Sequence, residues 1–161
     1  MASAAGLVEV FLPFAGSGVE EMLTGMKKLY PQADTGNGLT EKSAQLLQRY
    51  FSGERVEFRL ELDKEGFTPF QKRVYEYVAA IPYGQVKTYA RIAAEIGCRG
   101  AARGVGTAMA RNPLPIVIPC HRVVGASGAM TGYSAAGGIA TKKILLIMEG
   151  VTLDGNGRAK I

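Results

Sequence analysis

Apolar residues recur at helical spacing along much of the chain, and this periodicity predicts most of its secondary structure. Two of the expected helices have clear start signals. Thr68-Pro69-Phe70-Gln71 combines an N-cap threonine, a first-turn proline and a capping glutamine, and Thr88 stands at the N-cap position of the next helix. The helices expected from this pattern are 19–29, 46–51, 69–81, 89–96, 101–110 and 138–149.

Two further stretches have the pattern of strands. Residues 7–14 form a short apolar run, whose length alone does not distinguish a strand from a buried helix. Over 55–62 charged and apolar residues alternate, which is typical of a half-buried strand. The predicted fold is mixed α/β (α+β): a small N-terminal mixed α/β domain with antiparallel strands over 1–63, a mostly helical domain over 67–150, and a tail over 151–161.

The expected helices at 89–96 and 101–110 are separated by a short turn that contains glycine. This arrangement fits a helix-turn-helix, although plain helical hairpins that never bind DNA share it. Gly104 and Gly106 lie inside the second helix, where each glycine costs roughly 1 kcal/mol relative to alanine. Close packing on another helix would explain them. So would a smooth surface that enters the narrow minor groove of DNA while Arg103 projects into the duplex.

The composition is that of a folded, water-soluble chain: 161 residues, 47% hydrophobic and 20% charged. No apolar run has the length of a membrane helix, and the first residues lack a secretory pattern, so no membrane association and a cytoplasmic location are expected. Two cysteines, Cys98 and Cys120, and a single histidine, His121, exclude a disulfide-rich scaffold and a zinc ribbon. Neither residue type precedes Cys98, so no structural zinc site is expected in the first domain.

The net charge of +5 is concentrated in one part of the chain. Residues 1–66 hold seven basic and ten acidic side chains, and this part is not expected to contact nucleic acid. Segment 84–123 holds a single acidic residue, Glu95, and a basic excess equal to that of the whole chain. A local excess of this kind favours a polyanionic partner, although a solvated basic face is the alternative. Its basic residues are Lys87, Arg91, Arg99, Arg103, Arg111 and Arg122.

The chemistry-bearing residues follow one another at the end of a proline-rich run over 112–124. Its three prolines exclude a helix and favour an extended chain that leads to Cys120, His121 and Arg122. An imidazole near a thiol can produce the reactive thiolate, whereas an inert core thiol remains the interpretation of Cys98. Adjacent side chains of an extended chain point to opposite sides, so Cys120 and His121 need a turn after Pro119 or a bridging water.

Glu149 is the expected acceptor for the second nitrogen of His121. It stands at the end of the apolar helix expected over 138–149. A carboxylate there is on the unfavourable side of the helix dipole, which indicates a specific partner.

The sequence from Ile118 to Val124, Ile-Pro-Cys-His-Arg-Val-Val, closely resembles the O6-alkylguanine-DNA alkyltransferases, also called methylated-DNA-protein-cysteine methyltransferases. The likeness covers Phe67 to Gly150, and residues 1–66 match only the general layout of the variable N-terminal domain of that family. Besides the central run, the residues that carry the resemblance are Arg111-Asn112-Pro113, Gly128, Tyr133-Ser134 and Glu149-Gly150.

The resemblance implies a role for each of five residues in alkyl transfer. Cys120 is the implied alkyl acceptor, His121 the base that acts through a water, and Glu149 the carboxylate that orients the imidazole. Asn112 is similar to the hinge asparagine of the family. Tyr89 is similar to the tyrosine that helps rotate the nucleotide and hydrogen-bonds the leaving guanine.

The resemblance also implies double-stranded DNA carrying O6-alkylguanine as partner, bound in the minor groove by a winged helix-turn-helix-like motif. Arg103 takes the place of the extruded nucleotide, and the protein acts once, as a monomer without a cofactor. The other residues expected to contact DNA are Ala102, Arg99, Lys87, Arg111 and Arg122. The residues expected to line the base pocket are Tyr89, Val123, Tyr133, Ser134 and Met109.

Two departures and three alternatives accompany this interpretation. The loop over 133–138 is about two residues longer than the usual form of the family, and the zinc that some members carry has no ligands here. A non-catalytic lesion-binding protein is one alternative, although its known relatives have tryptophan in place of Cys120. A cysteine hydrolase and a plain helix-turn-helix regulator are the others, and the regulator leaves the Pro-Cys-His-Arg run unexplained.

Overall fold

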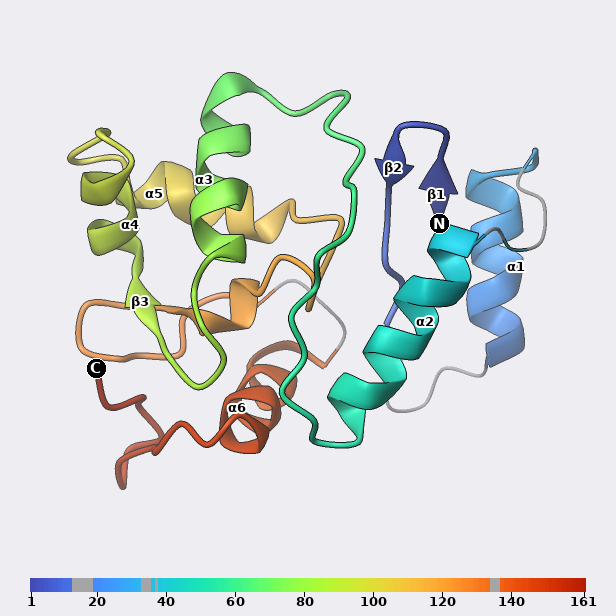
Figure 1. Cartoon of the computed structure of the whole chain (residues 1–161). Coiled ribbons are helices and arrows are strands. Elements are labelled where there is room, and N and C mark those ends of the chain that lie inside the picture. Colours follow the sequence, from blue (N-terminus) through green and yellow to red (C-terminus); the bar gives the residue numbers. More distant parts are fainter. Residues whose placement is uncertain (13–18, 33–35, 37, 134–136) are drawn as a thin grey trace.

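The computed structural model of the protein describes residues 1–12, 19–32, 36, 38–133 and 137–161. In Figure 1 the two N-terminal helices and the hairpin β1–β2 lie on one side, helices α3, α4 and α5 on the other, and α6 below them. The mixed α/β class predicted from the sequence is confirmed. The described elements are β1 (Ala2–Ser3), β2 (Gly6–Leu7), α1 (Val19–Leu29), α2 (Gly38–Phe51), α3 (Pro69–Ala79), β3 (Lys87–Thr88), α4 (Tyr89–Glu95), α5 (Ala102–Ala110), the 3-10 turn η1 (Cys120–Arg122), β4 (Val123–Val124) and α6 (Gly138–Met148).

Two short sheets connect distant parts of the chain. Strands β1 and β2 are antiparallel, with Ala2 opposite Leu7. Strands β3 and β4 are parallel, with Lys87 opposite Val123 and Thr88 opposite Val124. The second sheet therefore joins the start of α4 to the chain directly after η1.

The capping signals read at Thr68 and Thr88 are confirmed. The Thr68 hydroxyl accepts from the Gln71 amide at 3.2 Å, and the Gln71 side chain accepts from the Thr68 amide at 2.9 Å. Thr88 caps α4 in the same way, accepting from the Arg91 amide at 3.1 Å. These bonds satisfy amides that have no partner within the first helical turn, and so fix where the helices begin.

The strand predicted over 55–62 is wrong. Within that segment only Leu62 forms a bridge, to Leu7, although burial does alternate: Val56 is buried while Glu57 and Arg59 are exposed. The alternation arises because apolar side chains of an irregular segment pack on the core, without a neighbouring strand to complete a ladder. In the expected strand over 7–14 only Leu7 belongs to a strand, and residues 13–14 lie outside the described part.

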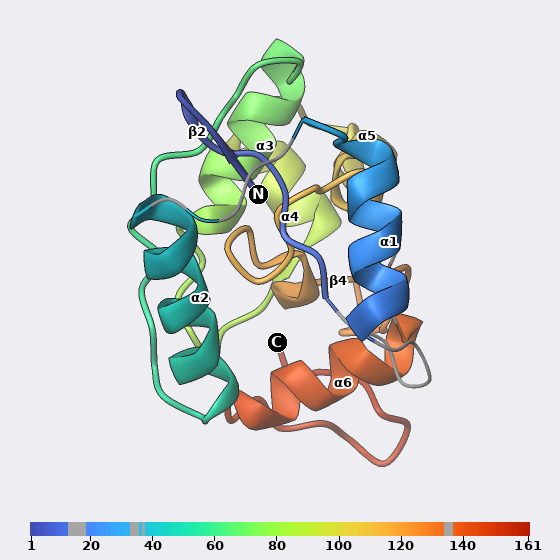
Figure 2. The same ribbon diagram turned by 90° about the vertical axis from the view of Figure 1, so that its right-hand side faces the viewer.

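The core crosses the boundary expected between the two domains. Leu7 belongs to the same buried cluster as Val74, Ile92 and Ile118, from α3, α4 and the run before η1. A second cluster combines Tyr50 and Val56 with Ile116 and Leu145. The division at residues 63–67 stays a prediction. Figure 2 looks onto the N-terminal side of the molecule, with α1 and α2 on either side of the view and α6 below them.

The last eleven residues, expected as a tail, are packed against the rest of the chain. Val151 and Ala159 are buried together with Val124 and Leu146. The Ala159 amide donates to the Gly128 carbonyl at 2.9 Å. None of the helices in the described part of the chain is long and apolar enough to cross a membrane.

Candidate active site and nucleic-acid interface

The chain turns sharply before and at Cys120, in place of the simple extended run expected there. Pro115 and Ile118 form a bridge with each other, and Ile116 between them has φ of 72°. Positive φ is unusual for a β-branched residue, so burial of this side chain must hold the turn. Cys120 and His121 then enter the 3-10 turn η1, which provides one of the two arrangements anticipated for bringing their side chains together.

Asn112 ties this turn to the residues around the thiol. Its Nδ2 donates to the Ile118 carbonyl at 2.8 Å, and its Oδ1 accepts from the Leu114 amide at 3.0 Å. Burial raises the pKa of the Cys120 thiol, and Asn112 acts to lower it. The side chain of Asn112 therefore joins the start of this turn to the residue two positions before the thiol.

His121 and Glu149 are brought together from η1 and the end of α6. Nε2 of His121 lies 2.8 Å from Oε1 of Glu149, and both side chains are buried. Burial lowers the pKa of His121, against the effect of Glu149, so the imidazole is neutral at pH 7. The other ring nitrogen, Nδ1, is buried without a hydrogen-bond partner in the described part of the chain. That atom is free to accept a proton.

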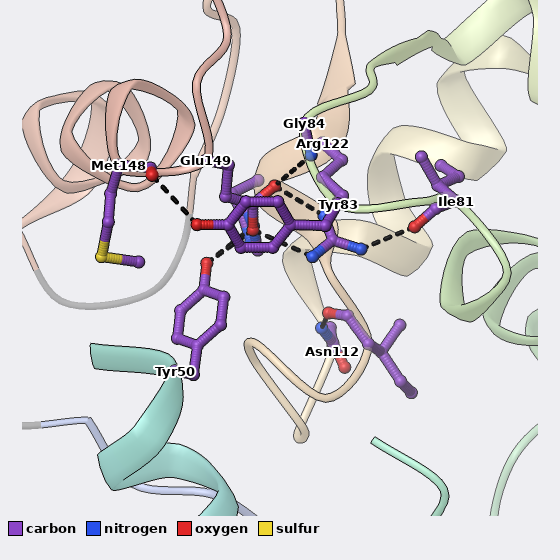
Figure 3. A network of polar contacts seen from close by, with 10 residues as sticks. Tyr50, Ile81, Tyr83, Gly84, Asn112, Arg122, Met148 and Glu149 are labelled. Atoms are coloured by element: carbon purple, nitrogen blue, oxygen red, sulfur yellow. Dashed lines mark hydrogen bonds and ion pairs between the residues drawn. The ribbon is translucent and has the colours of Figure 1, made fainter. Parts of the chain in front are cut away.

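Glu149 is the centre of the polar network drawn in Figure 3. Its Oε1 accepts from Tyr50 at 2.6 Å and its Oε2 accepts from the Gly84 amide at 3.2 Å, in addition to the contacts with His121 and Arg122. Burial by itself raises the pKa of Glu149, but the hydrogen bonds from His121 and Arg122 outweigh it and hold the pKa at about 2. The sequence predicted a specific partner for Glu149, and the structure provides four: Tyr50, Gly84, His121 and Arg122.

Arg122 does not lie on the surface where it was expected to contact DNA. The residue is 6% exposed, and its guanidinium contacts Glu149 through Nε at 2.8 Å and Nη2 at 2.9 Å. Nη1 donates to the Ile81 carbonyl at 2.6 Å. The buried carboxylate needs a charged partner, and this takes Arg122 inward, so its assignment to the interface is corrected.

The thiol of Cys120 is buried, and burial raises its pKa. The resting thiol is therefore protonated at neutral pH, and a nucleophilic thiolate requires a base such as His121. Cys120 belongs to the main buried cluster, against which Tyr89 and Tyr133 pack.

Lys142 is a buried basic residue that the sequence interpretation did not assign to the site. It is fully buried on α6, and its Nζ donates to the carbonyls of Val123 at 2.5 Å and Thr131 at 3.4 Å. Burial lowers the pKa of Lys142 to about 8, although Cys120 acts to raise it. In turn Lys142 acts to lower the pKa of the thiol. The only available signal was a pair of lysines, Lys142 and Lys143, within a mostly apolar helix.

An open cavity of about 840 Å³ lies next to α5. Its volume is within the range of small-ligand sites. Tyr89 and Tyr133 line it together with Arg103, and Tyr89 donates to the Thr131 carbonyl at 2.8 Å. Met109 and Val123, expected in the pocket wall, are buried in the main core and are not among its described lining residues. Ser134 lies outside the described residues.

The expected DNA-contacting residues other than Arg122 lie around this cavity or on the surface. Arg103 and Ala102 line the cavity, and Arg103 is exposed. Arg99 and Arg111 are exposed at the two ends of α5, while Lys87 is partly buried in β3. The structure thus assembles a cavity with an exposed arginine at its edge.

The two glycines of α5 have different surroundings, and the minor-groove explanation offered for them stays a prediction. A Cβ at Gly104 would lie 3.2 Å from the ring of Phe70, which indicates close packing of α5 on α3. A Cβ at Gly106 would lie 3.9 Å from Tyr89, and Gly106 lines the cavity. The cavity wall is smooth at Gly106 because no side chain projects there.

A family model described as 6-O-methylguanine DNA methyltransferase, DNA binding domain, matches residues 69–151, just over half of the chain. The chain belongs to this family. The resemblance inferred from the Pro-Cys-His-Arg run is confirmed at that level, and the matched segment contains both η1 and Glu149.

Relatives of this alkyltransferase-family chain are similar over differing lengths. The methylated-DNA--protein-cysteine methyltransferase of Mycobacterium bovis is 52% identical over 103 residues, 64% of this chain and 61% of the relative. That of Methanosarcina barkeri is 44% identical over 80% of this chain and 81% of the relative. The chain therefore matches about three fifths of the Mycobacterium bovis protein.

Two solved structures support the family fold. The crystal structure of Mycobacterium tuberculosis O6-methylguanine methyltransferase aligns with a TM-score of 0.68 at 42% identity, covering 89% of this chain and 81% of that one. A second structure of the Mycobacterium tuberculosis protein, in complex with DNA, aligns with a TM-score of 0.65 at 48% identity, covering 71% and 69%.

Proposed function

We propose that this protein repairs O6-alkylguanine in DNA by transferring the alkyl group to its own Cys120. The observation that carries the proposal is the geometry at η1. The buried thiol belongs to the cluster against which Tyr89 and Tyr133, two residues of the cavity wall, pack. It is followed by a neutral histidine whose Nε2 contacts Glu149 and whose Nδ1 has no partner among the described residues. This is the arrangement that general-base activation of a nucleophile requires.

The reaction is a single displacement at the alkyl carbon. His121 takes the thiol proton at Nδ1 through a bridging water, and the sulfur of Cys120 forms a bond to the alkyl carbon as the bond between that carbon and O6 breaks. The electron pair of the broken bond goes to guanine. The proton released from the thiol returns to guanine, so that guanine leaves neutral. The Tyr89 hydroxyl, which donates to the Thr131 carbonyl in the structure, exchanges that acceptor for guanine and stabilises the developing charge by a hydrogen bond.

The alkylated nucleotide must leave the duplex before it can react. A methylated oxygen inside the base stack is out of reach of a side chain, and extrusion costs a few kcal/mol of stacking and pairing. We propose that α5, as the second helix of a winged helix-turn-helix-like motif, docks in the minor groove, and that Arg103 fills the gap left by the base. The exposed Arg103 at the cavity edge supports this, as does the DNA complex of the Mycobacterium tuberculosis relative.

Each molecule reacts once in this proposal. The product is a thioether, which has no group that is easily expelled, and the reaction as proposed leaves the alkyl group on Cys120 without any cofactor. We further propose that the protein acts as a monomer in the cytoplasm or on the nucleoid, since its target is DNA.

Incubation with O6-benzylguanine followed by intact-protein mass spectrometry tests the proposal. One benzyl group per molecule on Cys120 is expected, with release of one equivalent of guanine. The Cys120→Ala variant should gain no benzyl group and should bind DNA with unchanged affinity. The Cys98→Ala variant, the matched control, should react like the wild type. Binding to alkylated DNA without any adduct would support the lesion-binding alternative, and repeated turnover of an ester would support the hydrolase.

A further inference from the structure

Tyr50 is a buried side chain of α2 that reaches the pair formed by His121 and Glu149. It is 0% exposed, and its Oη donates to Oε1 of Glu149 at 2.6 Å. The Tyr50 Oη also lies 3.3 Å from Nε2 of His121. Figure 3 shows Tyr50 approaching Glu149 from α2, which is far from both residues in sequence. The ring is held by aromatic neighbours, namely Phe51, Phe58 and Tyr83.

The proton positions in this cluster follow from counting donors and acceptors. Tyr50 has a single hydroxyl proton, and the short contact assigns it to the Glu149 carboxylate. Burial, followed by the charge of Glu149, raises the pKa of Tyr50, so the hydroxyl remains a donor. Its oxygen therefore faces Nε2 of His121 as an acceptor. Nε2 then has two acceptors beside it and must carry the ring proton, which leaves the lone pair on Nδ1.

We propose that Tyr50 is a positioning residue that keeps the proton of His121 on Nε2, so that Nδ1 stays available as the base for Cys120. The inference rests on the proposed alkyl transfer and extends it. Tyr50 precedes residue 69, where the match to the family's DNA-binding domain begins. The N-terminal part of the chain thus completes the active site, a role separate from any contact with DNA.

Nitrogen NMR of the imidazole tests the proton position directly, because His121 is the single histidine of the chain. In the wild type Nε2 is expected to carry the proton near neutral pH. In Tyr50→Phe, which removes the hydroxyl and leaves the Glu149 carboxylate as the acceptor beside Nε2, the population of the tautomer protonated on Nδ1 is expected to rise. This readout requires no alkyl transfer, so it separates failure of this inference from failure of the proposed function.

The pH profile of the reaction with free O6-benzylguanine provides the kinetic test. At neutral pH the rate of Tyr50→Phe should fall by about tenfold, a part of the roughly 10²- to 10⁴-fold contribution of a general base. The rate of the Tyr50→Phe variant should increase with pH, as that of the wild type does, but over a higher pH range. At high pH, where hydroxide ionises the thiol without a base, the rates of variant and wild type should converge.

Tyr30→Phe is the matched control. Tyr30 also donates to a carboxylate, that of Glu9, in the N-terminal part of the chain, and it has no contact with His121 or Glu149 in the described structure. It should leave the tautomer and the pH profile unchanged. In a Glu149→Gln background, Tyr50→Phe should add little further loss, because the two act through one unit.

Three outcomes would overturn the inference. One is a wild-type ring proton on Nδ1. Another is a Tyr50→Phe variant with unchanged tautomer and rate. The third is a Tyr50→Phe deficit that is equal at all pH values, which indicates a merely structural role. A wild-type protein that forms no adduct, although His121 is protonated on Nε2, would contradict the proposed function. It would not contradict the role assigned to Tyr50.

Discussion

Arg122 and Glu149 form a buried two-point ion pair that joins η1 to the end of α6. Nε lies 2.8 Å from Oε2 and Nη2 lies 2.9 Å from Oε1. Through Nη1 the same guanidinium also holds the Ile81 carbonyl, in the turn after α3. The Arg122 side chain thus connects η1, the end of α6 and the turn after α3 around the proposed base. Its positive charge neutralises Glu149, and its planar guanidinium donates to both partners.

Replacing Arg122 by Met should destabilise the fold by about 3–5 kcal/mol, because Glu149 would remain buried without its charged partner. Arg122→Lys should also be strongly destabilised, since an ammonium does not reproduce the two parallel hydrogen bonds. The measurement is urea unfolding. Arg49→Met is the control, because its pair with Glu54 is largely exposed and should contribute little. Equal stabilities of the two Met variants would contradict the importance assigned to the buried pair.

Acid should unfold the protein in a window set by Glu149. The pKa of this carboxyl is lowered from 4.5 in its ordinary state to about 2 in the folded protein. Its stabilising contribution is therefore complete above pH 4.5 and is lost as the pH falls towards 2, where the folded protein must also take up the proton. Unfolding free energies measured across this range should decline more steeply for the wild type than for Glu149→Gln. Parallel slopes would show that other carboxyls dominate.

Lys142→Met should raise the pKa of the Cys120 thiol, since the charge of Lys142 acts to lower it. The rate of alkyl transfer to Cys120 at neutral pH is expected to decrease and to recover as the pH rises. Stopped-flow measurement of the thiolate absorbance against pH provides the thiol pKa. Lys143→Met, at the adjacent partly exposed position, should behave like the wild type. A lower thiol pKa in Lys142→Met would reverse the sign of the proposed interaction.

Arg103→Ala should slow repair of O6-alkylguanine in duplex DNA much more than the reaction with free O6-benzylguanine. The free base needs no extrusion from a stack, whereas the duplex substrate loses the side chain that fills the gap. Single-turnover rates on the two substrates measure the difference. Equal slowing of both would remove the flipping role from Arg103 and point to a general effect on the cavity.

The two glycines of α5 should respond oppositely to alanine. Gly106→Ala should stabilise the protein by about 0.5–1 kcal/mol, because the new methyl makes only ordinary contact with Tyr89 and the helix gains propensity. In Gly104→Ala the methyl lies 3.2 Å from the ring of Phe70, so the strain should offset the gain or exceed it. Thermal unfolding of both variants distinguishes the sites, and a destabilised Gly106→Ala would show that its surroundings are tighter than described.

Local physical chemistry in the sequence determined much of this molecule. The capping residues Thr68 and Thr88 form hydrogen bonds within three residues, so the starts of α3 and α4 could be read directly. The adjacent Cys120 and His121, together with the unfavourable place of Glu149 at a helix end, indicated the site that we propose to be reactive. These features depend on residues that are close together in the sequence, so they could be predicted without the structure.

Tertiary packing decided the rest. The alternating segment 55–62 has the pattern of a strand. Apart from the bridge between Leu62 and Leu7, no strand of the described residues pairs along it, and a ladder needs a paired neighbour. Arg122 looked like part of a basic surface until the buried charge of Glu149 was placed beside it. Tyr50 carried no local signal, because its partners lie 71 and 99 residues away. Burial and hydrogen-bond partners are properties of the folded chain, so only the structure could assign them.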